Sequence, residues 1–260
     1  MERSPSLLER AAEALARDPV PTLELARRVM GMRGNPEAAA RAVFTLLGSD
    51  PRFRVDVDGV WTLAEDADPV GRPLAGLRFA VVDVETTGGA PTRGDRITEV
   101  AVVHVNDGIV GESFESLVDP GRPIPPRIQG ITGITDAMVR TAPPFEAIAD
   151  RVRDRIRDRV FVAHNAAFDW RFVHAELLEA TGDSPRVERL CTVRLGRLLE
   201  PRLRSHGLDS LAGHFGVPIA DRHRALGDAL ATARILVHLL READARGIRD
   251  LGSLRRHLET

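Results

Sequence analysis

The feature that most constrains this chain is an apolar run that ends in two acidic residues. Residues 79–82 are Phe-Ala-Val-Val, as in a strand that is buried on both faces, and Asp83 and Glu85 follow. Side chains alternate along a strand, so these two carboxylates point to the same side. Two acids at the end of a core strand repel each other and resist loss of water unless a cation lies between them. This pattern fits a metal site, and it fits two solvated strand-end acids equally well.

Length and composition set the outer limits. The chain has 260 residues, enough for one large domain or for a medium domain with a small companion. The net charge of −2 gives no overall basic character, so nucleic acid would have to bind at a local patch. The first residues lack a signal-peptide pattern, and no apolar run is long enough to cross a membrane. We therefore expect a cytoplasmic protein without a membrane partner.

Residues 1–66 predict a small domain of three helices and a hairpin. Apolar residues recur at helical spacing in three segments: residues 5–16, 22–30 and 36–47. In the hairpin that follows, a three-residue turn ending at Gly59 pairs Val55 with Trp61. This order of elements resembles a winged-helix module found at the N-terminus of some bacterial transcription and restriction proteins.

The charge of this first domain favours a structural or protein-binding role over sequence-specific DNA reading. Residues 1–63 contain nine Arg and nine acidic residues, and the third helix has only Arg41 beside an apolar surface. Residues 67–75 then predict a linker, because the stretch from Ala64 to Pro73 is acidic and rich in Pro and Gly.

Residues 76–260 predict an α/β domain with a mixed five-stranded sheet flanked by helices. Two strand patterns follow the opening strand and are joined by a hairpin signal at residues 106–108, as in an antiparallel meander. A fourth buried strand is expected at residues 160–163, after a helical stripe from Phe145 to Ile156, and a fifth near residues 187–191.

Arginines alternate with other residues between positions 151 and 159 and are interleaved with Asp150, Asp154 and Asp158. Such a segment can bind phosphate, or it can be the solvated side of a helix balanced by ion pairs one turn apart. The balance of charges favours the solvated helix side.

Two further acids occupy places where a carboxylate is costly. Asp169 lies one turn into a helix that follows a buried strand, and we expect Asn165 to be the N-cap of that helix. Asp228 lies on the apolar stripe of a helix that begins near Ala225, and His223 precedes that helix. Together with the strand acids, these residues suit hard cations such as Mg²⁺ or Mn²⁺ better than zinc. Two such ions can activate a water and stabilise the leaving oxygen of a phosphodiester.

The same residues resemble the DnaQ-like, or DEDDh, family of 3′–5′ exonucleases. The three motifs of this family look, in order, like Asp83-x-Glu85, His164-Asn165-x-x-Phe168-Asp169 and His223-x-x-x-x-Asp228. The resemblance covers about residues 76–242. A related branch has Tyr in place of the motif His, and this chain contains no Tyr.

The resemblance implies a ribonuclease-H-like fold and the removal of nucleoside 5′-monophosphates from a 3′ end with two ions, Mg²⁺ or Mn²⁺. It implies that Asp83, Glu85 and Asp228 bind the first ion. It also implies that Asp83 bridges to the second ion, whose site is completed by Asp169.

The resemblance also assigns roles around the ions. It implies that His223 is the general base for the attacking water and that Thr86 and Thr87 line the pocket of the terminal nucleotide. For His164 we expect a structural role that orients its motif.

We therefore expect a metal-dependent 3′–5′ exonuclease of the proofreading or repair type that acts on single-stranded DNA or frayed 3′ ends. Its expected partner is a DNA polymerase or a repair protein. Two alternatives stay open. One is an exoribonuclease that trims RNA, since the sequence gives no clear means of sensing a 2′-hydroxyl. The other is a non-catalytic regulator that only binds nucleic acid.

Overall fold

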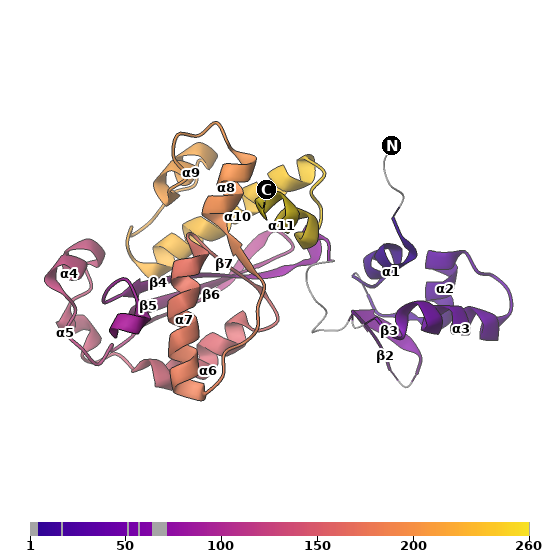
Figure 1. Cartoon of the computed structure of the whole chain (residues 1–260), viewed down its shortest axis with the longest axis horizontal. Coiled ribbons are helices and arrows are strands. Elements are labelled where there is room, and N and C mark those ends of the chain that lie inside the picture. Colours follow the sequence, from indigo (N-terminus) through magenta and orange to yellow (C-terminus); the bar gives the residue numbers. More distant parts are fainter. Residues whose placement is uncertain (1–4, 17, 51, 57, 64–71, 260) are drawn as a thin grey trace. The chain divides into compact units, whose positions relative to one another are not determined.

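The computed structural model describes residues 5–259 except 17, 51, 57 and 64–71 (Figure 1). The chain forms two compact units, Met1–Gly76 with Asp250–Gly252, and Leu77–Arg249 with Ser253–Thr260. Most of the predicted linker, residues 67–75, lies outside the described residues. No helix in the described part of the chain is long and apolar enough to cross a membrane.

The first unit combines helices with a small antiparallel sheet. Its helices are α1 (Leu7–Leu15), α2 (Thr22–Met30) and α3 (Pro36–Leu47). Its strands are β1 (Val20–Pro21), β2 (Phe53–Val55) and β3 (Val60–Leu63), in the order β1-β3-β2. The predicted hairpin register is confirmed, because Val55 lies opposite Trp61. Strand β1 was not predicted, since two residues are too short to show a periodicity.

Trp61 holds this unit together. Its side chain is 1% exposed and packs with apolar residues of all three helices. Its indole Nε1–H donates to Thr22 Oγ1 at 2.9 Å, and the Thr22 hydroxyl donates to Gly59 O at 2.6 Å. A buried indole N–H requires such an acceptor. The winged-helix resemblance of this unit stays a prediction.

The second unit is built on a mixed sheet of five strands in the order β6-β5-β4-β7-β8. The strands are β4 (Arg78–Thr86), β5 (Ile97–Asn106), β6 (Ile109–Leu117), β7 (Val160–Ala163) and β8 (Arg189–Cys191). Strands β4, β5 and β6 are antiparallel neighbours, whereas β7 runs parallel to β4 and β8 runs parallel to β7. The predicted mixed five-stranded sheet is thus confirmed, with β4 in its middle.

Helices cover both faces of this sheet. The helices that follow β6 in the chain are α4 (Pro126–Thr132), α5 (Asp136–Val139), α6 (Phe145–Ile156), α7 (Ala166–Thr181), α8 (Thr192–Leu199), α9 (Leu208–Phe215), α10 (Ala225–Ala245) and α11 (Leu251–Glu259). Helices α6 and α7 lie side by side and pack on Ala80, Val82 and Val84 of β4 (Figure 1). Helix α10 packs on β4, β5 and β6, against the side chains that alternate with these. Because β4 is covered on both faces, its residues 79–82 are at most 1% exposed.

Two buried glutamates tie the helices that carry the motif acids to β5. Glu99 on β5 receives the Arg224 guanidinium, with both Nε–O distances at 3.1 Å, and the Ala225 backbone N–H at 2.8 Å. This fixes the start of α10. Glu176 on α7 accepts from Arg96 Nε at 2.8 Å and from the Ile97 N–H at 3.1 Å. Charge-assisted bonds of this kind are stronger than neutral ones, and they satisfy carboxylates that are 2% and 4% exposed.

We predict that Glu99→Gln lowers the free energy of unfolding by about 1–3 kcal/mol. The carboxylate accepts from Arg224 and from the Ala225 N–H with two oxygens, whereas the amide has only one oxygen to accept with. Urea unfolding followed by circular dichroism measures the change. Glu112→Gln is the matched control, since Glu112 is exposed on β6. Equal unfolding midpoints for the two variants would contradict the role given to Glu99.

Candidate metal centre

The end of β4 presents two half-buried carboxylates on one side of the sheet. Asp83 and Glu85 alternate with the side chains that face α6 and α7, so they lie on the face that packs against α10. The register of β4 against β5 shifts directly after Glu85, where Glu85 stands opposite Glu99 and Thr86 opposite Ile97. The sheet therefore ends its regular pairing at the point where the acids lie.

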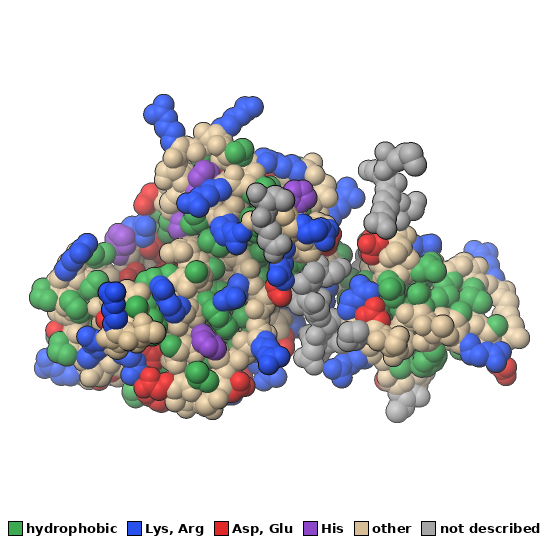
Figure 2. Space-filling view, in the orientation of Figure 1, with side chains coloured by type: hydrophobic (Ala, Val, Ile, Leu, Met, Phe, Trp, Pro, Cys, Tyr) green, Lys and Arg blue, Asp and Glu red, His purple; other side chains and the backbone are tan. Residues whose placement is uncertain are grey.

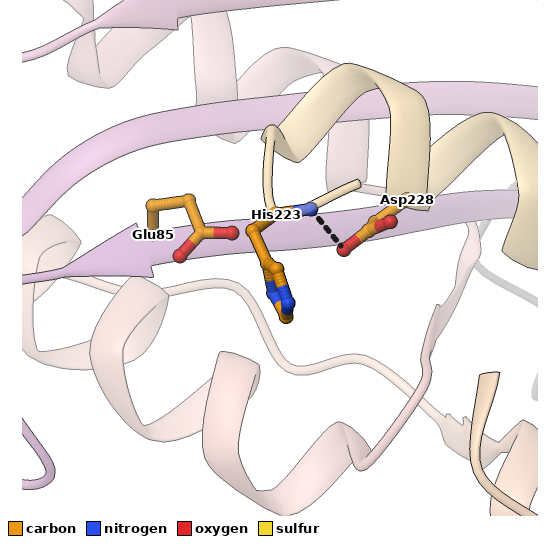
Figure 3. A group of neighbouring side chains, drawn as sticks. All are labelled: Glu85, His223 and Asp228. Carbon is orange, nitrogen blue, oxygen red and sulfur yellow. Dashed lines mark hydrogen bonds between the residues drawn. The ribbon is translucent and has the colours of Figure 1, made fainter. Parts of the chain in front are cut away.

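The turn before α10 brings His223 and Asp228 to these acids. His223 has a left-handed backbone (φ 64°), and its N–H donates to Asp228 Oδ2 at 3.3 Å. Figure 3 shows the carboxylates of Glu85 and Asp228 on two sides of His223. Ligand atoms of these three residues lie within 4.8 Å of one another. The structure thus joins residues from two motifs that are about 140 positions apart in the sequence.

Asp169 reaches the same strand from α7. Its side chain is 4% exposed, and Oδ1 accepts from the Val84 N–H at 3.2 Å, between the two strand acids. Asp83 and Asp169 do not belong to the group of three within 4.8 Å in the described residues. Their charges nevertheless interact, because Asp169 raises the pKa of Asp83.

Asn165 stands at the N-cap position of α7, as predicted, but it does not cap the helix with its side chain. Asn165 precedes the helix, but its side chain makes no capping hydrogen bond, and its backbone is left-handed (φ 87°). A capping side chain requires an extended backbone at that position, which points its oxygen at the first N–H groups of the helix. The first turn of α7 therefore has no side-chain cap.

Burial raises the pKa of every acid in the group, and repulsion from the other acids adds to this effect for Asp83 and Glu85. The pKa of Asp83 is raised well above its ordinary value by burial and by Asp169, Glu85 and Asp228. Burial, followed by repulsion from Asp228, raises the pKa of Glu85 to about 8. Burial raises the pKa of Asp169 to about 8, although the hydrogen bond from the Val84 N–H acts to lower it. The acids therefore favour either protons or added positive charge.

Arg222 supplies one such positive charge, and the sequence did not indicate it. Its Nη1 is hydrogen-bonded to Asp228 Oδ2, and its Nε lies 3.1 Å from Asp209 Oδ1. Burial raises the pKa of Asp228, and Arg222 opposes this effect. Arginines stand on both sides of His223, and only the three-dimensional contacts separate their roles: Arg224 binds Glu99, whereas Arg222 binds Asp228.

The residues of this site fit a hard divalent cation. Asp228 Oδ1 is buried and has no hydrogen-bond partner among the described residues. A buried carboxylate oxygen without a partner is costly, and a cation is the partner that removes this cost. The donor set consists of four carboxylates and one histidine, which suits Mg²⁺ or Mn²⁺ better than zinc.

The other predicted residues support the loops around the site. Thr86 Oγ1 donates to Gly88 O at 2.7 Å, and Thr87 Oγ1 accepts from the Arg96 N–H at 3.0 Å. Both hydroxyls thus hold the turn after β4. His164 Nδ1 lies 2.9 Å from Thr192 Oγ1, and burial lowers its pKa to about 4. His164 is therefore neutral at pH 7 and ties β7 to the start of α8.

A mixed sheet of this order, with acids at the end of its central strand, defines a ribonuclease-H-like fold of the exonuclease class. Residues 80–236 match the RNase_T family model, which describes exonucleases, and the chain therefore belongs to this family. The resemblance to DnaQ-like exonucleases is confirmed. The family is metal-dependent, in agreement with the donor set.

Known proteins similar to this chain agree with the family. A DNA polymerase III subunit epsilon-like protein of Rhodobacter capsulatus is 40% identical over 188 residues, which are 70% of this chain and 26% of that protein. The 3′–5′ exonuclease DinG of Bacillus subtilis is 37% identical over 179 residues, 69% of this chain and 19% of DinG. The chain thus spans about a quarter or less of the length of these two relatives.

Solved structures show the same fold. Exonuclease X in complex with 5′ overhanging duplex DNA is 30% identical, with a TM-score of 0.52 over 66% of this chain and 93% of that chain. Exonuclease I of E. coli with a dT13 oligonucleotide is 20% identical, with a TM-score of 0.57 over 66% of this chain and 42% of that chain, and shows the fold alone.

We predict that the metal-free protein loses stability as the pH rises from about 4 to about 8. The folded state holds a proton on Asp169 up to pH about 8, whereas an unfolded Asp releases it near pH 3.9. Asp169→Asn has no proton to lose there. In chelator at pH 8 it should unfold at least about 2–4 °C above the unsubstituted protein, with a smaller difference at pH 5.

Differential scanning calorimetry checks this pH dependence. Asp183→Asn is the control, because Asp183 is exposed in the loop after α7 and its variant should follow the unsubstituted protein at both pH values. Added Mn²⁺ should stabilise the unsubstituted protein more than Asp169→Asn. If Asp169→Asn is less stable than the unsubstituted protein in chelator at pH 8, the folded state does not disfavour the ionised form of Asp169.

Proposed function

We propose that this protein is a metal-dependent 3′–5′ exonuclease that releases nucleoside 5′-monophosphates from DNA 3′ ends. The observation that carries the proposal is the convergence of motif residues from three distant segments at the end of β4: Asp83, Glu85, Asp169, His223 and Asp228. Family membership supports the reaction type. The names of the relatives, which include DNA polymerase III proteins and DinG, favour DNA as the substrate.

In this proposal the carboxylates hold two ions. Asp83, Glu85 and Asp228 would hold one Mg²⁺ or Mn²⁺, and Asp83 with Asp169 would hold the other. When bound, these ions supply positive charge that offsets the charge of the phosphodiester and makes a water more acidic. The raised pKa values of the acids mean that ion binding also releases protons from the site.

The side chains around the ions then perform the remaining tasks. His223 accepts the proton of the attacking water, and its left-handed turn and its N–H bond to Asp228 hold it at the carboxylates. Thr86 and Thr87 line the pocket of the terminal nucleotide at the turn after β4. His164 keeps the turn before α7 in place through Thr192.

We also propose that residues 1–66 form a winged-helix-like module, that residues 67–75 form the linker and that residues 76–260 form the exonuclease domain. The proposed partner is a DNA polymerase or a repair protein in the cytoplasm, since the relatives include polymerase III proteins. In a proofreading or repair role, the substrate would be single-stranded DNA or a frayed 3′ end.

The first test is release of the label from a 3′-labelled DNA strand with Mn²⁺ and with chelator. Asp83→Ala and Asp228→Ala should each lower the rate by at least about 100-fold, because each removes a proposed ion ligand. Circular dichroism checks that both variants fold, and Glu112→Ala on β6 is the control. Metal-dependent release that persists in both variants would refute the proposed site.

The second test concerns the proton transfer. His223→Ala should lower kcat by about 10²–10⁴-fold and change KM little, because a general base acts in the transition state. Steady-state rates over a range of substrate concentrations separate the two constants. A rise in KM at unchanged kcat would assign His223 to substrate binding instead.

Matched DNA and RNA oligomers separate this proposal from the alternatives. Faster release from RNA would indicate an RNA-trimming exoribonuclease. Binding of either oligomer without release in Mn²⁺ would indicate a non-catalytic nucleic-acid-binding regulator.

A further inference from the structure

The second unit contains a cavity of about 980 Å³. We call it the arginine pocket after four of its lining residues, Arg189, Arg194, Arg197 and Arg204. Its walls come from the turn before α7, from β8, from α8 and from the loop before α9. Figure 2 shows blue basic side chains over the region of α8.

The charge of the arginine pocket is not balanced. Among the described residues, no Asp or Glu lines it and none of its four arginines pairs with a carboxylate. Arg194 donates to the Leu258 carbonyl, and Arg189 lies 5.6 Å from the centre of the Trp170 ring, so both are positioned by neutral groups. Arg197 and Arg204 are exposed. Four positive charges thus line one cavity, and no described carboxylate pairs with them.

The arginines of α6 show the contrast. Arg153 lies 2.7 Å from Asp150, and Arg157 lies 3.7 Å from Asp154 and 3.4 Å from Asp158. The predicted ion pairs one turn apart are present for Arg153 and Arg157, whereas Arg151 and Arg155 lie 4.7 Å from the centre of the Phe114 ring. The arginine pocket differs because four guanidinium groups line one cavity, and a cluster of guanidinium groups is a typical site for phosphate.

The motif that contains His164 and Asp169 contributes to this pocket. Asn165, Ala166 and Ala167 line it, and these residues lie between His164 and Asp169 in the sequence. Ala166 and Ala167 begin α7, whose first turn has no side-chain cap, so the N–H groups there add to the attraction for an anion. The segment that carries His164 and Asp169 therefore also forms part of the wall of the arginine pocket.

The lining residues favour recognition of a backbone rather than of bases. Among the described lining residues, His206 alone has a ring, and its Nε2 already lies 2.9 Å from Glu200 O. Sites that read or stack bases present aromatic side chains, whereas arginines contact phosphates irrespective of sequence. We propose that the arginine pocket binds the phosphate backbone of the substrate's single strand, on the 5′ side of the nucleotide that is removed. This inference rests on the proposed function.

The test is the double variant Arg197→Ala/Arg204→Ala in the full chain. Fluorescence anisotropy with a labelled dT oligomer of about 20 nucleotides, in an Asp83→Ala background that prevents cleavage, should show affinity about tenfold lower. The slope of log K against log salt, taken between about 50 and 200 mM, should become shallower by about 1.4, the value for two lost single-strand phosphate contacts.

The matched control is Arg153→Ala/Arg157→Ala, which removes the same charge from α6 and should leave both the affinity and the slope unchanged. In cleavage assays with Asp83 intact, the pocket variant should lose more kcat/KM with the long oligomer than with a dinucleotide, which is too short to reach the pocket. Equal affinity of the two double variants would overturn the proposal.

Three outcomes separate failure of the pocket proposal from failure of the proposed function. If dTMP loses as much affinity as the long oligomer in the pocket variant, the pocket is a mononucleotide site, and the strand proposal is wrong. If the unsubstituted protein neither cleaves nor binds the oligomer, the proposed function fails. If it cleaves and the pocket variant binds as the control does, only the arginine pocket proposal fails.

Discussion

The repulsion among the carboxylates at the end of β4 is the constraint on which the second unit depends. Burial raises the pKa of Asp83, Glu85 and Asp169, and neighbouring carboxylates raise it further for Asp83 and Glu85, so the fold brings these groups together at a cost. Contacts further away offset that cost. Glu99 holds the start of α10 through Arg224, and Glu176 holds α7 through Arg96. Without these contacts, the helices could retreat from β4 and relieve the repulsion. Glu99 and Glu176 thus keep the acids at the end of β4 close together.

The backbone conformation of the turn before α10 also holds the site residues in place. Asp221 and His223 both have left-handed backbones, which cost energy for residues other than Gly and persist where the surroundings fix them. The Arg224 N–H closes this turn on Asp221 O at 3.0 Å, and the His223 N–H is directed at Asp228. This turn is connected to the first residues of α10 and to β5, and together they support His223, the proposed general base. A histidine within a regular helix would not direct its backbone N–H at Asp228.

Much of the second unit was predictable because its central strand is unusual. Four apolar residues followed by Asp83 and Glu85 indicated a buried strand with one-sided acids, and Asp228 on an apolar helix stripe indicated a costly carboxylate. Contacts between distant residues were not predictable. Arg222 and Arg224 look alike in the sequence. Only the fold determines that Arg222 pairs with Asp228 and Arg224 pairs with Glu99. Asn165 has the residue type of an N-cap, but a tight turn out of β7 gives it a left-handed backbone. Strand β1 exists only because β3 offers it a partner.

The net charge of −2 conceals a separation of charge that only the folded chain has. The acids gather at the end of β4, and the four arginines of the arginine pocket line a cavity whose wall includes residues 165–167 of the motif with His164 and Asp169. A polyanion is repelled by the acids until cations bind there, whereas the arginines attract it. If the arginine pocket binds the substrate as proposed, the backbone of a bound strand lies at the arginines, and the end that reaches the acids is the end at which the proposed ions bind.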